Sequence, residues 1–227
     1  MLSSPTRKLV VVADLVGSRR LTPLDRRAVQ AFIREILGPR GAFRYSGGDE
    51  FEWALPDLPE SLDELVRFRL RLGAALEGLP PVRFRVGIGR GEVTVEDATG
   101  GPYAEDGPAY HRARAAIDRL KAKPSRRRRT HDRPLDPVGA TRRATAIDDG
   151  RWLPSRDALL LLMDKLAGGW TLPQWEVAHL SAEGQTYAQI GERLGISEQA
   201  VHKRLSAAQL DIYLEGHAAL KADWVVA

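Results

Sequence analysis

The amino-acid sequence predicts an α+β protein, with an antiparallel sheet domain first and a small all-α domain after it. Three observations support this prediction. Strand-like and helix-like segments alternate as β-α-β-β-α-β-β-α through the first half of the 227-residue chain. A segment rich in arginine and proline, 122–155, then interrupts the hydrophobic periodicity. Beyond it, capping boxes and glycines mark several short helices. We therefore expect a sheet domain at 1–121, a basic linker with a possible extra strand at 122–155, and a connecting helix with a helical domain at 156–227.

The first six segments follow the order of the ferredoxin-like split βαβ arrangement, which we expect to place helices on one face of the sheet. An apolar, β-branched run opens the series, as is typical of a central strand buried on both faces. Thr22 and Pro23 signal one helix start, and Ser61 with Glu64 forms a capping box for another. The predicted elements are, in order, strand Leu9–Ala13, a helix from Pro23 to the residue before Gly38, strands Phe43–Tyr45 and Phe51–Leu55, helix Leu62–Leu76 with Arg69 towards water or the rim, strand Val82–Ile88, turn Gly89–Gly91, strand Glu92–Val95, helix Tyr110–Leu120, a possible strand Ala144–Ile147 and helix Arg156–Leu166.

The composition is that of a globular protein, with its positive charge concentrated in one segment. The formal net charge is +4, and residues 121–150 hold nine Lys/Arg against four Asp/Glu. Such a run attracts phosphate groups, or it forms a solvated linker. The chain has no cysteine, which excludes disulfides and thiolate metal sites. No apolar run approaches the roughly 20 residues that span a bilayer. We expect a cytoplasmic protein that does not enter the membrane.

Two carboxylates at predicted strand ends suggest a metal site. Asp14 ends the first apolar run, and Asp49 lies in the Gly-rich turn between the two paired strands. Mg²⁺ takes one or two carboxylates and completes its coordination with waters and substrate phosphates. Alternatively, Asp14 caps a local turn, and Gly47–Asp49 serves only as a hairpin turn, because Gly and Asp tolerate positive φ.

Three motifs in chain order carry a family resemblance. Asp14-x-x-Gly17, Gly48-Asp49 and Arg85-Val86-Gly87-Ile88-Gly89-x-Gly91 resemble the class III nucleotide cyclase catalytic domain. Gly47–Phe51 also spells GGDEF, the diguanylate cyclase signature. Over nearly its full length the chain is similar to the SatD-like family, in which a compact cyclase-like domain is joined to a C-terminal helix-turn-helix.

The resemblance implies a nucleotide site with magnesium. Asp14 and Asp49 would hold the Mg²⁺ ion. The residues that would contact the nucleotide are Val16, Gly17, Ser18, Arg19, Gly48 and Arg114. Cyclases also carry an Asn and an Arg on a late helix, and the matching positions here are His111 and Ala115. This departure favours nucleotide binding without turnover. An active nucleotidyl cyclase-type enzyme with an appended DNA-binding domain is the alternative.

The C-terminal third contains the pattern of a helix-turn-helix. Thr186 and Gln189 form a capping box, Gly195 suits the end of that helix, and Ser197 caps the next one. Tyr187–Leu205 resembles region 4 of sigma factors and the LuxR-type regulators. The second helix of such a pair enters the DNA major groove. The residues expected to contact DNA are Thr186, Glu198, Gln199, His202, Lys203 and Ser206, together with Arg126, Arg127, Arg128 and Arg129 of the linker. A helical hairpin used for protein contacts is the alternative.

These features together predict a DNA-binding transcriptional regulator. Its cyclase-like domain would bind a nucleotide with Mg²⁺ as an effector, or would dimerise. We expect a homodimer, since a two-fold protein matches a palindromic operator. The expected partners are double-stranded DNA, a nucleotide and a second copy of the chain. A scaffold that dimerises without a ligand is a further alternative, against which the two intact acids argue.

Overall fold

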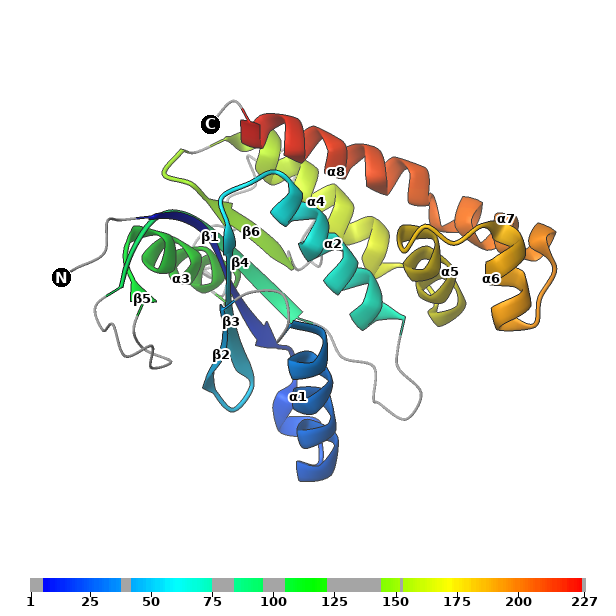
Figure 1. Cartoon of the computed structure of the whole chain (residues 1–227), viewed down its shortest axis with the longest axis horizontal. Coiled ribbons are helices and arrows are strands. Elements are labelled where there is room, and N and C mark those ends of the chain that lie inside the picture. Colours follow the sequence, from blue (N-terminus) through cyan, green and yellow to red (C-terminus); the bar gives the residue numbers. More distant parts are fainter. Residues whose placement is uncertain are drawn as a thin grey trace, which may run out of the picture.

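The apolar strand near the N-terminus is the centre of a six-stranded, mostly antiparallel sheet (Figure 1). The structure is a computed structural model, and it describes residues 6–37, 42–74, 84–95, 105–121, 144–151 and 153–225. Its elements are β1 (Thr6–Leu15), the 3₁₀ turn η1 (Ser18–Arg20), α1 (Pro23–Leu37), β2 (Ala42–Gly47), β3 (Glu50–Pro56), α2 (Glu60–Gly73), β4 (Phe84–Val95), β5 (Glu105–Asp106), α3 (Pro108–Lys121), β6 (Thr145–Asp148), α4 (Pro154–Gly168), α5 (Leu172–Ala182), α6 (Tyr187–Leu194), α7 (Glu198–Ala208) and α8 (Leu210–Val225).

The sheet has the strand order β2-β3-β1-β4-β5, and β6 pairs in parallel with β4. β1 lies antiparallel to both β3 and β4. Successive residues of β1 are buried on opposite faces, as the sequence predicted: Val11 packs in the larger hydrophobic cluster with α1 and α2, and Val10 packs in a second cluster with α3. The strand predicted at Ala144–Ile147 is confirmed as β6.

Helices cover both faces of the sheet, so the expectation that all of them share one face is wrong. α3 lies against β1 and β4 on the face opposite α1 and α2 (Figure 1). Ala109, Ala113 and Ile117 bury this side of α3 completely. The physical reason is that alternate residues of β1 are apolar on both faces, and an apolar sheet face exposed to water would cost about 25 cal/mol per Å².

The turn predicted at Gly89–Gly91 is also wrong, because β4 continues through it as one strand of twelve residues. Gly87 and Gly89 face α3 rather than turning the chain. A Cβ atom added to Gly89 would lie 2.1 Å from the Ala109 carbonyl oxygen, and one added to Gly87 would lie 2.5 Å from the Ala113 carbonyl oxygen. These glycines are therefore required for the close approach of a helix backbone to the sheet.

The start of α2 differs from the prediction, and so does the direction of one of its arginines. The helix begins at Glu60, and Ser61 lies inside its first turn, where its hydroxyl donates to the Pro56 carbonyl at 2.7 Å. Ser61 therefore does not cap the helix. Arg69 is half-buried rather than open to water, and its guanidinium donates to the Asp164 carboxylate of α4 at 2.7 Å.

The Asp164 carboxylate joins three elements at the junction between the sheet and the C-terminal helices. Its side chain is only 2 % exposed. Besides Arg69, it accepts hydrogen bonds from the backbone amides of Ala144 and Thr145, each at 2.8 Å, and from the Thr145 hydroxyl at 2.9 Å. A buried carboxylate is tolerated when its oxygens are saturated in this way. The start of β6 is thereby fastened to α2 and α4.

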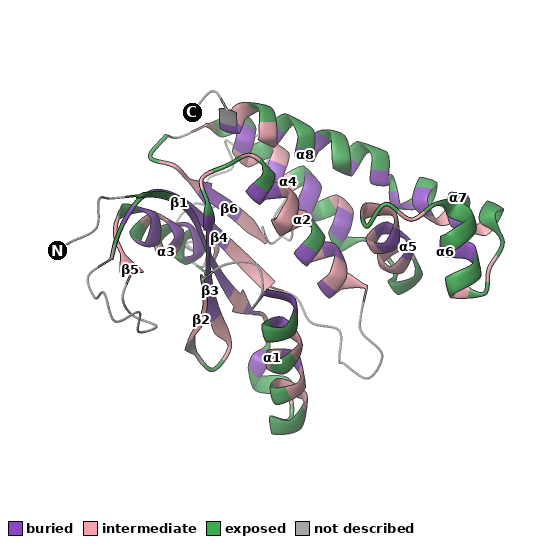
Figure 2. Cartoon of the chain, in the orientation of Figure 1, coloured by how far each residue is buried: buried purple, intermediate pink, exposed green. Residues whose placement is uncertain are grey.

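The C-terminal helices pack on the helical layer of the sheet domain and share its core. One hydrophobic cluster of buried residues runs from Leu9 in β1 to Trp224 in α8. Trp175 of α5 lies directly on Gly73, where an added Cβ would be 2.2 Å from the indole ring. Figure 2 shows the buried (purple) surfaces of α2, α4 and α8 turned towards one another. The helical part is therefore packed against the sheet domain rather than suspended from it.

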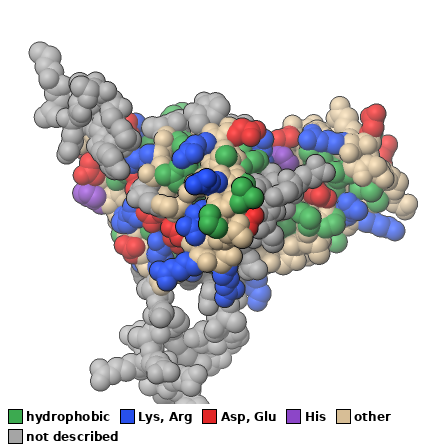
Figure 3. Space-filling model, turned by 90° about the horizontal axis from the view of Figure 1, so that it is seen from below, with side chains coloured by type: hydrophobic (Ala, Val, Ile, Leu, Met, Phe, Trp, Pro, Cys, Tyr) green, Lys and Arg blue, Asp and Glu red, His purple; other side chains and the backbone are tan. Residues whose placement is uncertain are grey.

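The described surface carries charges of both signs. Figure 3 shows Lys and Arg side chains among Asp and Glu over the face seen from below. Within the described residues, no helix has the length and apolar character needed to cross a membrane.

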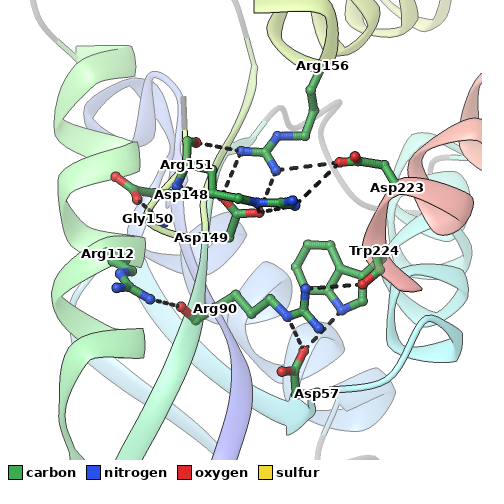
Figure 4. Close-up of polar contacts among 10 residues, drawn as sticks. All are labelled: Asp57, Arg90, Arg112, Asp148, Asp149, Gly150, Arg151, Arg156, Asp223 and Trp224. Atoms are coloured by element: carbon green, nitrogen blue, oxygen red, sulfur yellow. Dashed lines mark hydrogen bonds and ion pairs between the residues drawn. The ribbon is translucent and has the colours of Figure 1, made fainter. Parts of the chain in front are cut away.

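Two groups of polar contacts fasten the end of α8 to the rest of the molecule (Figure 4). In the first, Asp57 accepts from the Arg90 guanidinium at 2.7 Å and from the Trp224 indole nitrogen at 3.0 Å. The Arg90 guanidinium also lies over the Trp224 ring, 4.7 Å from its centroid, and donates to the Trp224 carbonyl at 3.1 Å. Trp224, near the end of α8, is thus buried against β4 and the residue that follows β3.

The second group centres on the buried ion pair between Asp149 and Arg156. The two terminal guanidinium nitrogens of Arg156 donate to the two Asp149 carboxylate oxygens at 2.7 and 3.0 Å. The side chain of Arg156 is 5 % exposed and that of Asp149 is 2 % exposed. Arg156 and Arg151 also lie within 4.0 Å of the Asp223 carboxylate of α8. Burial alone would raise the pKa of Asp149, but the hydrogen bonds from Arg156 and Arg151 outweigh it and hold this pKa well below its ordinary value.

The substitution Gly89→Ala tests the close approach of α3 to β4. The new methyl group would meet helix backbone, which cannot rotate away, and we expect a loss of about 2–3 kcal/mol in the free energy of unfolding. Urea denaturation measures this value. The matched control is Gly168→Ala, whose Cβ meets nothing within 4 Å; it should leave stability unchanged or raise it by up to about 1 kcal/mol. Equal stability of the two variants would contradict the packing described here.

The substitution Asp149→Asn tests the buried ion pair. At pH 7 it leaves the buried Arg156 charge with only the more distant Asp223 carboxylate, 3.7 Å away, which should cost about 3 kcal/mol, the lower end of the loss on breaking a buried ion pair. The pKa of Asp149 is lower in the folded protein than its ordinary value of 3.8. The wild-type contribution is therefore fully present above that value and is lost as the pH falls below it. Urea midpoints between pH 7 and pH 2 should fall less steeply in the variant. Glu215→Gln, exposed on α8, should keep the wild-type profile.

Candidate functional site

The two acids singled out in the sequence lie on neighbouring segments: Asp14 is near the end of β1, and Asp49 is in the turn between β2 and β3. Asp14 is opposite Glu50 of β3 and opposite Arg85 of β4 in the sheet register. The Leu15 amide donates to the Asp49 carbonyl at 2.9 Å, which holds the hairpin turn against the end of β1. The backbone at Asp14 and the backbone at Asp49 are therefore adjacent.

Both acids have partners within the protein. The Asp14 carboxylate lies 3.0 Å from an Arg85 guanidinium nitrogen and 3.2 Å from the Lys121 ammonium at the end of α3. The same ammonium lies 3.1 Å from the Glu50 carboxylate. Partial burial lowers the pKa of Lys121, but hydrogen bonds with Glu50 and Asp14 outweigh it and raise this pKa above its ordinary value. Lys121 therefore remains a cation between two acids.

The turn after β1 is closed onto the second acid. Gly17 adopts a left-handed conformation with φ of 77°. The Ser18 hydroxyl is buried and donates to the Asp49 carboxylate, and the Ser18 carbonyl accepts from Arg26 of α1 at 3.2 Å. Val16 is half-buried and Arg19 is exposed. Of the residues predicted to contact phosphate in this turn, Gly17 and Arg19 are exposed to solvent, whereas Ser18 is buried.

The two remaining predicted nucleotide contacts lie near the same edge. Gly48 is exposed in the hairpin turn, and its carbonyl accepts from the Gln30 side chain. Arg114 of α3 forms ion pairs with Glu50 and Glu52, the latter at 2.9 Å. Partial burial lowers the pKa of Arg114, and the hydrogen bond and charge of Glu50, with the charge of Glu52, raise it overall. This guanidinium is bound to acids of the sheet.

The sequence reasoning missed Glu50, Arg85 and Lys121. The first two could have been found from strand alternation, because they share the α3 face of the sheet with Asp14. Lys121 could not, since its position depends on the face that α3 covers. Together with Asp14, these side chains form a row of alternating acidic and basic groups at this end of the strands.

The residues at this end of β1 and β3 provide some of the ligands that a divalent cation needs. Among the described residues there is no group of three or more His, Cys, Asp or Glu side chains that could hold a metal ion. Mg²⁺, however, needs only one or two carboxylates when phosphates and waters complete its coordination. Asp14 and Glu50 share the Lys121 ammonium, so this point of the sheet accepts a positive charge. A metal ion that binds Asp14 would compete with Lys121.

The second candidate site is formed by α6, a short turn and α7. The caps predicted from the sequence are confirmed. Thr186 and Gln189 form a capping box, with the Gln189 side chain accepting from the Thr186 amide at 2.8 Å. Gly195 ends α6 in a left-handed conformation with φ of 64°, and the Ser197 hydroxyl accepts from the Ala200 amide at 3.2 Å. Local sequence signals therefore determine where both helices begin and end.

The inner faces of α6 and α7 are buried together with α5 and α8. Ile190 and Val201 are fully buried, and Leu205 is 7 % exposed. Gly191 permits the turn to fold back, because an added Cβ would lie 2.7 Å from the Ile196 carbonyl. At the end of α7, the Trp170 indole donates to the Ala208 carbonyl at 2.7 Å. The orientation of α7 is thus determined on one side by packing.

The outer face of α7 is polar and open. The exposed residues predicted to contact DNA are Glu198, Gln199, His202, Lys203 and Ser206. Thr186 is exposed at the start of α6, with its hydroxyl used in the cap. Basic and acidic side chains are both visible in Figure 3 at the end of the molecule where α6 and α7 lie in Figure 1. Arg126–Arg129, the predicted phosphate contacts of the linker, lie outside the described residues.

The comparison with protein families gives a match over almost the whole chain. The model of the SatD family matches residues 10–222, which include the acids at the sheet edge and all of α4–α7. Comparisons with curated proteins and with solved structures gave no match. Since the family model covers far more than half of the sequence, the chain belongs to the SatD family.

Proposed function

We propose that this protein is a DNA-binding transcriptional regulator whose sheet domain binds a nucleotide with Mg²⁺ as an effector. The observation that carries the proposal is the arrangement of α6 and α7. Two short helices are joined by a three-residue turn, and the second buries one face while presenting polar side chains on the other. A helix presented in this way fits the DNA major groove, with its N-terminal residues towards the base edges.

The exposed side chains of α7 have the chemistry needed to contact DNA. Gln199 can form paired hydrogen bonds with adenine, and Lys203 can donate to guanine or to phosphate. Glu198 can accept from the cytosine amino group, while His202 and Ser206 extend the same face by one more turn. Arg126–Arg129 of the linker would add sequence-independent phosphate contacts.

We propose in addition that the sheet domain is a ferredoxin-like, cyclase-like domain. The order β2-β3-β1-β4 with antiparallel neighbours supports this, because it is the strand order of the split βαβ arrangement. α3, β5 and β6 would be additions to that core. α5–α7 would form the helix-turn-helix unit, packed on the sheet domain through α2 and α8.

The nucleotide would bind at the edge where Asp14, Asp49 and the turn at Val16–Arg19 lie. Support comes from the adjacency of the two acid-bearing segments and from the Lys121 ammonium, which is a cation held beside Asp14. Mg²⁺ would take the place of Lys121 at Asp14, and the released Lys121 and Arg19 would face the phosphates.

A homodimer is the proposed DNA-bound form, and light scattering of the protein on its DNA site tests it.

Selection from random DNA duplexes tests DNA binding. We expect one sequence class to be enriched by the wild-type protein, and Lys203→Ala to weaken binding to it. If Lys203 reads a guanine, the loss should be about 1–3 kcal/mol and confined to one position. If Lys203 contacts phosphate, the slope of the logarithm of the binding constant against the logarithm of the salt concentration should decrease in magnitude by about one. Lys165→Ala, an equal charge change at an exposed position of α4, is the control and should bind as wild type. Selection that enriches no sequence would contradict the proposal.

Thermal unfolding with Mg²⁺ and each nucleoside triphosphate tests the effector site. We expect stabilisation of about 2.7 kcal/mol at a hundredfold excess over Kd, and its loss in Asp14→Ala and Asp49→Ala. Lys121→Met removes the competing cation and should strengthen Mg²⁺ binding. Unchanged Mg²⁺ affinity in Lys121→Met, with no stabilisation of the wild type, would contradict the metal site. Pyrophosphate in the same mixtures would show turnover and favour the cyclase alternative.

A further inference from the structure

A cavity of about 230 Å³ lies between the sheet and the C-terminal helices, away from the edge that carries Asp14 and Asp49. Its walls come from β1, β4 and β6 on one side and from α2, α4, α5 and α8 on the other. The walls are mainly aliphatic and aromatic, with Phe68, Met163 and Trp175 among them. We propose that this cavity is a binding site for a small, uncharged molecule, largely apolar and about two fused rings in size.

The volume sets the size of the ligand. An apolar cavity of about 150 Å³ stays dry and binds benzene, so a cavity of about 230 Å³ has room for a bicyclic ring system. Ligand sites are usually apolar clefts with a few polar groups that orient the ligand. This cavity has the same composition, since Arg69, Asp164, Tyr213 and His217 are its polar wall residues besides Thr145.

The polar groups specify what the ligand carries. Asp164 is saturated by four donors and is 2 % exposed, so it offers no free acceptor. His217 is held by Asp63 at 2.7 Å. Arg69 lines the cavity and donates to Asp164 at 2.7 Å and to the Thr145 hydroxyl at 3.5 Å, and it is hydrogen-bonded to Tyr213. A guanidinium has five N–H donors, which is more than these partners use. A ligand oxygen that accepts a hydrogen bond from Arg69 suits this site. The Asp164 charge balances the Arg69 charge, which favours a neutral ligand over an anion.

The position of the cavity connects the ligand to α7. Tyr213, His217 and Leu220 of α8 form part of the wall. α7 and α8 are joined through a single residue, Gln209, whose φ is 51°. A ligand that moves α8 outward would therefore tilt α7 directly. In a DNA-binding protein, this would make the cavity a second effector site, distinct from the proposed nucleotide site.

Titration of the full-length protein with 2-naphthol tests the cavity by calorimetry. We expect saturable binding of one molecule per chain, tighter than that of naphthalene, because the oxygen meets Arg69. Gly168→Phe adds a ring at the part of the cavity wall that Gly168 forms, where a Cβ meets nothing within 4 Å; it should weaken binding at least tenfold. Gly169→Phe is the matched control, since Gly169 is outside the wall and its Cβ would make only ordinary contacts. It should bind as wild type.

Absence of 2-naphthol binding to the wild type, or an equal loss in both variants, would overturn the proposal. Equal affinities for 2-naphthol and naphthalene would overturn the role of Arg69. If Gly168→Phe is unfolded by circular dichroism, Leu65→Phe fills the cavity from α2 and should show the same loss. These measurements need no DNA, so they separate this proposal from the proposed function. 2-Naphthol should also change the affinity of the wild-type protein for a selected DNA site at least threefold. It should leave the DNA affinity of Gly168→Phe unchanged. An unchanged DNA affinity of the wild type would overturn the coupling to α7.

Discussion

The buried carboxylate of Asp164 is the interaction on which the arrangement of this molecule depends. It receives a guanidinium from α2, a hydroxyl and two backbone amides from the start of β6, and it is carried by α4. A carboxylate taken out of water costs several kcal/mol unless such donors replace its hydration. Elements distant in sequence are therefore held together by a group that is favourable only when all of them are in place. This makes the junction between the sheet and the C-terminal helices specific as well as stable.

The same junction explains why the molecule does not consist of two loosely connected parts. One hydrophobic cluster includes β1, α2, α4, α5 and α8, and the polar contacts of Asp57 and Asp149 fasten the far end of α8. A group of helices attached in this way moves together with the sheet domain as one rigid unit. Any signal that passes from the acids at the sheet edge to α7 must therefore act through small shifts of packed helices, not through a free hinge.

Local chemistry made the helical part predictable, whereas tertiary packing limited the prediction for the sheet part. Thr186, Gly195 and Ser197 determine their turn through neighbours within a few residues, and the structure agrees with each of them. Gly89 was misinterpreted because a glycine that admits a helix backbone and a glycine that turns a chain look alike in one sequence. The ion pair of Arg69 and the cation between Asp14 and Glu50 depend on which face a distant helix covers, and no local pattern contains that information.

The glycine-lined face of β4 has a consequence for the charge at the sheet edge. Where Ala109 and Ala113 sit against Gly89, the helix cannot slide along the strand without bringing a larger side chain into a space that holds only backbone. Lys121 is two to three helical turns further along the same rigid rod. The absence of side chains at these glycines therefore determines the position of α3 along the strand, and with it the position of the Lys121 ammonium. The charge environment of Asp14 and Glu50 thus depends on glycines that do not contact either acid.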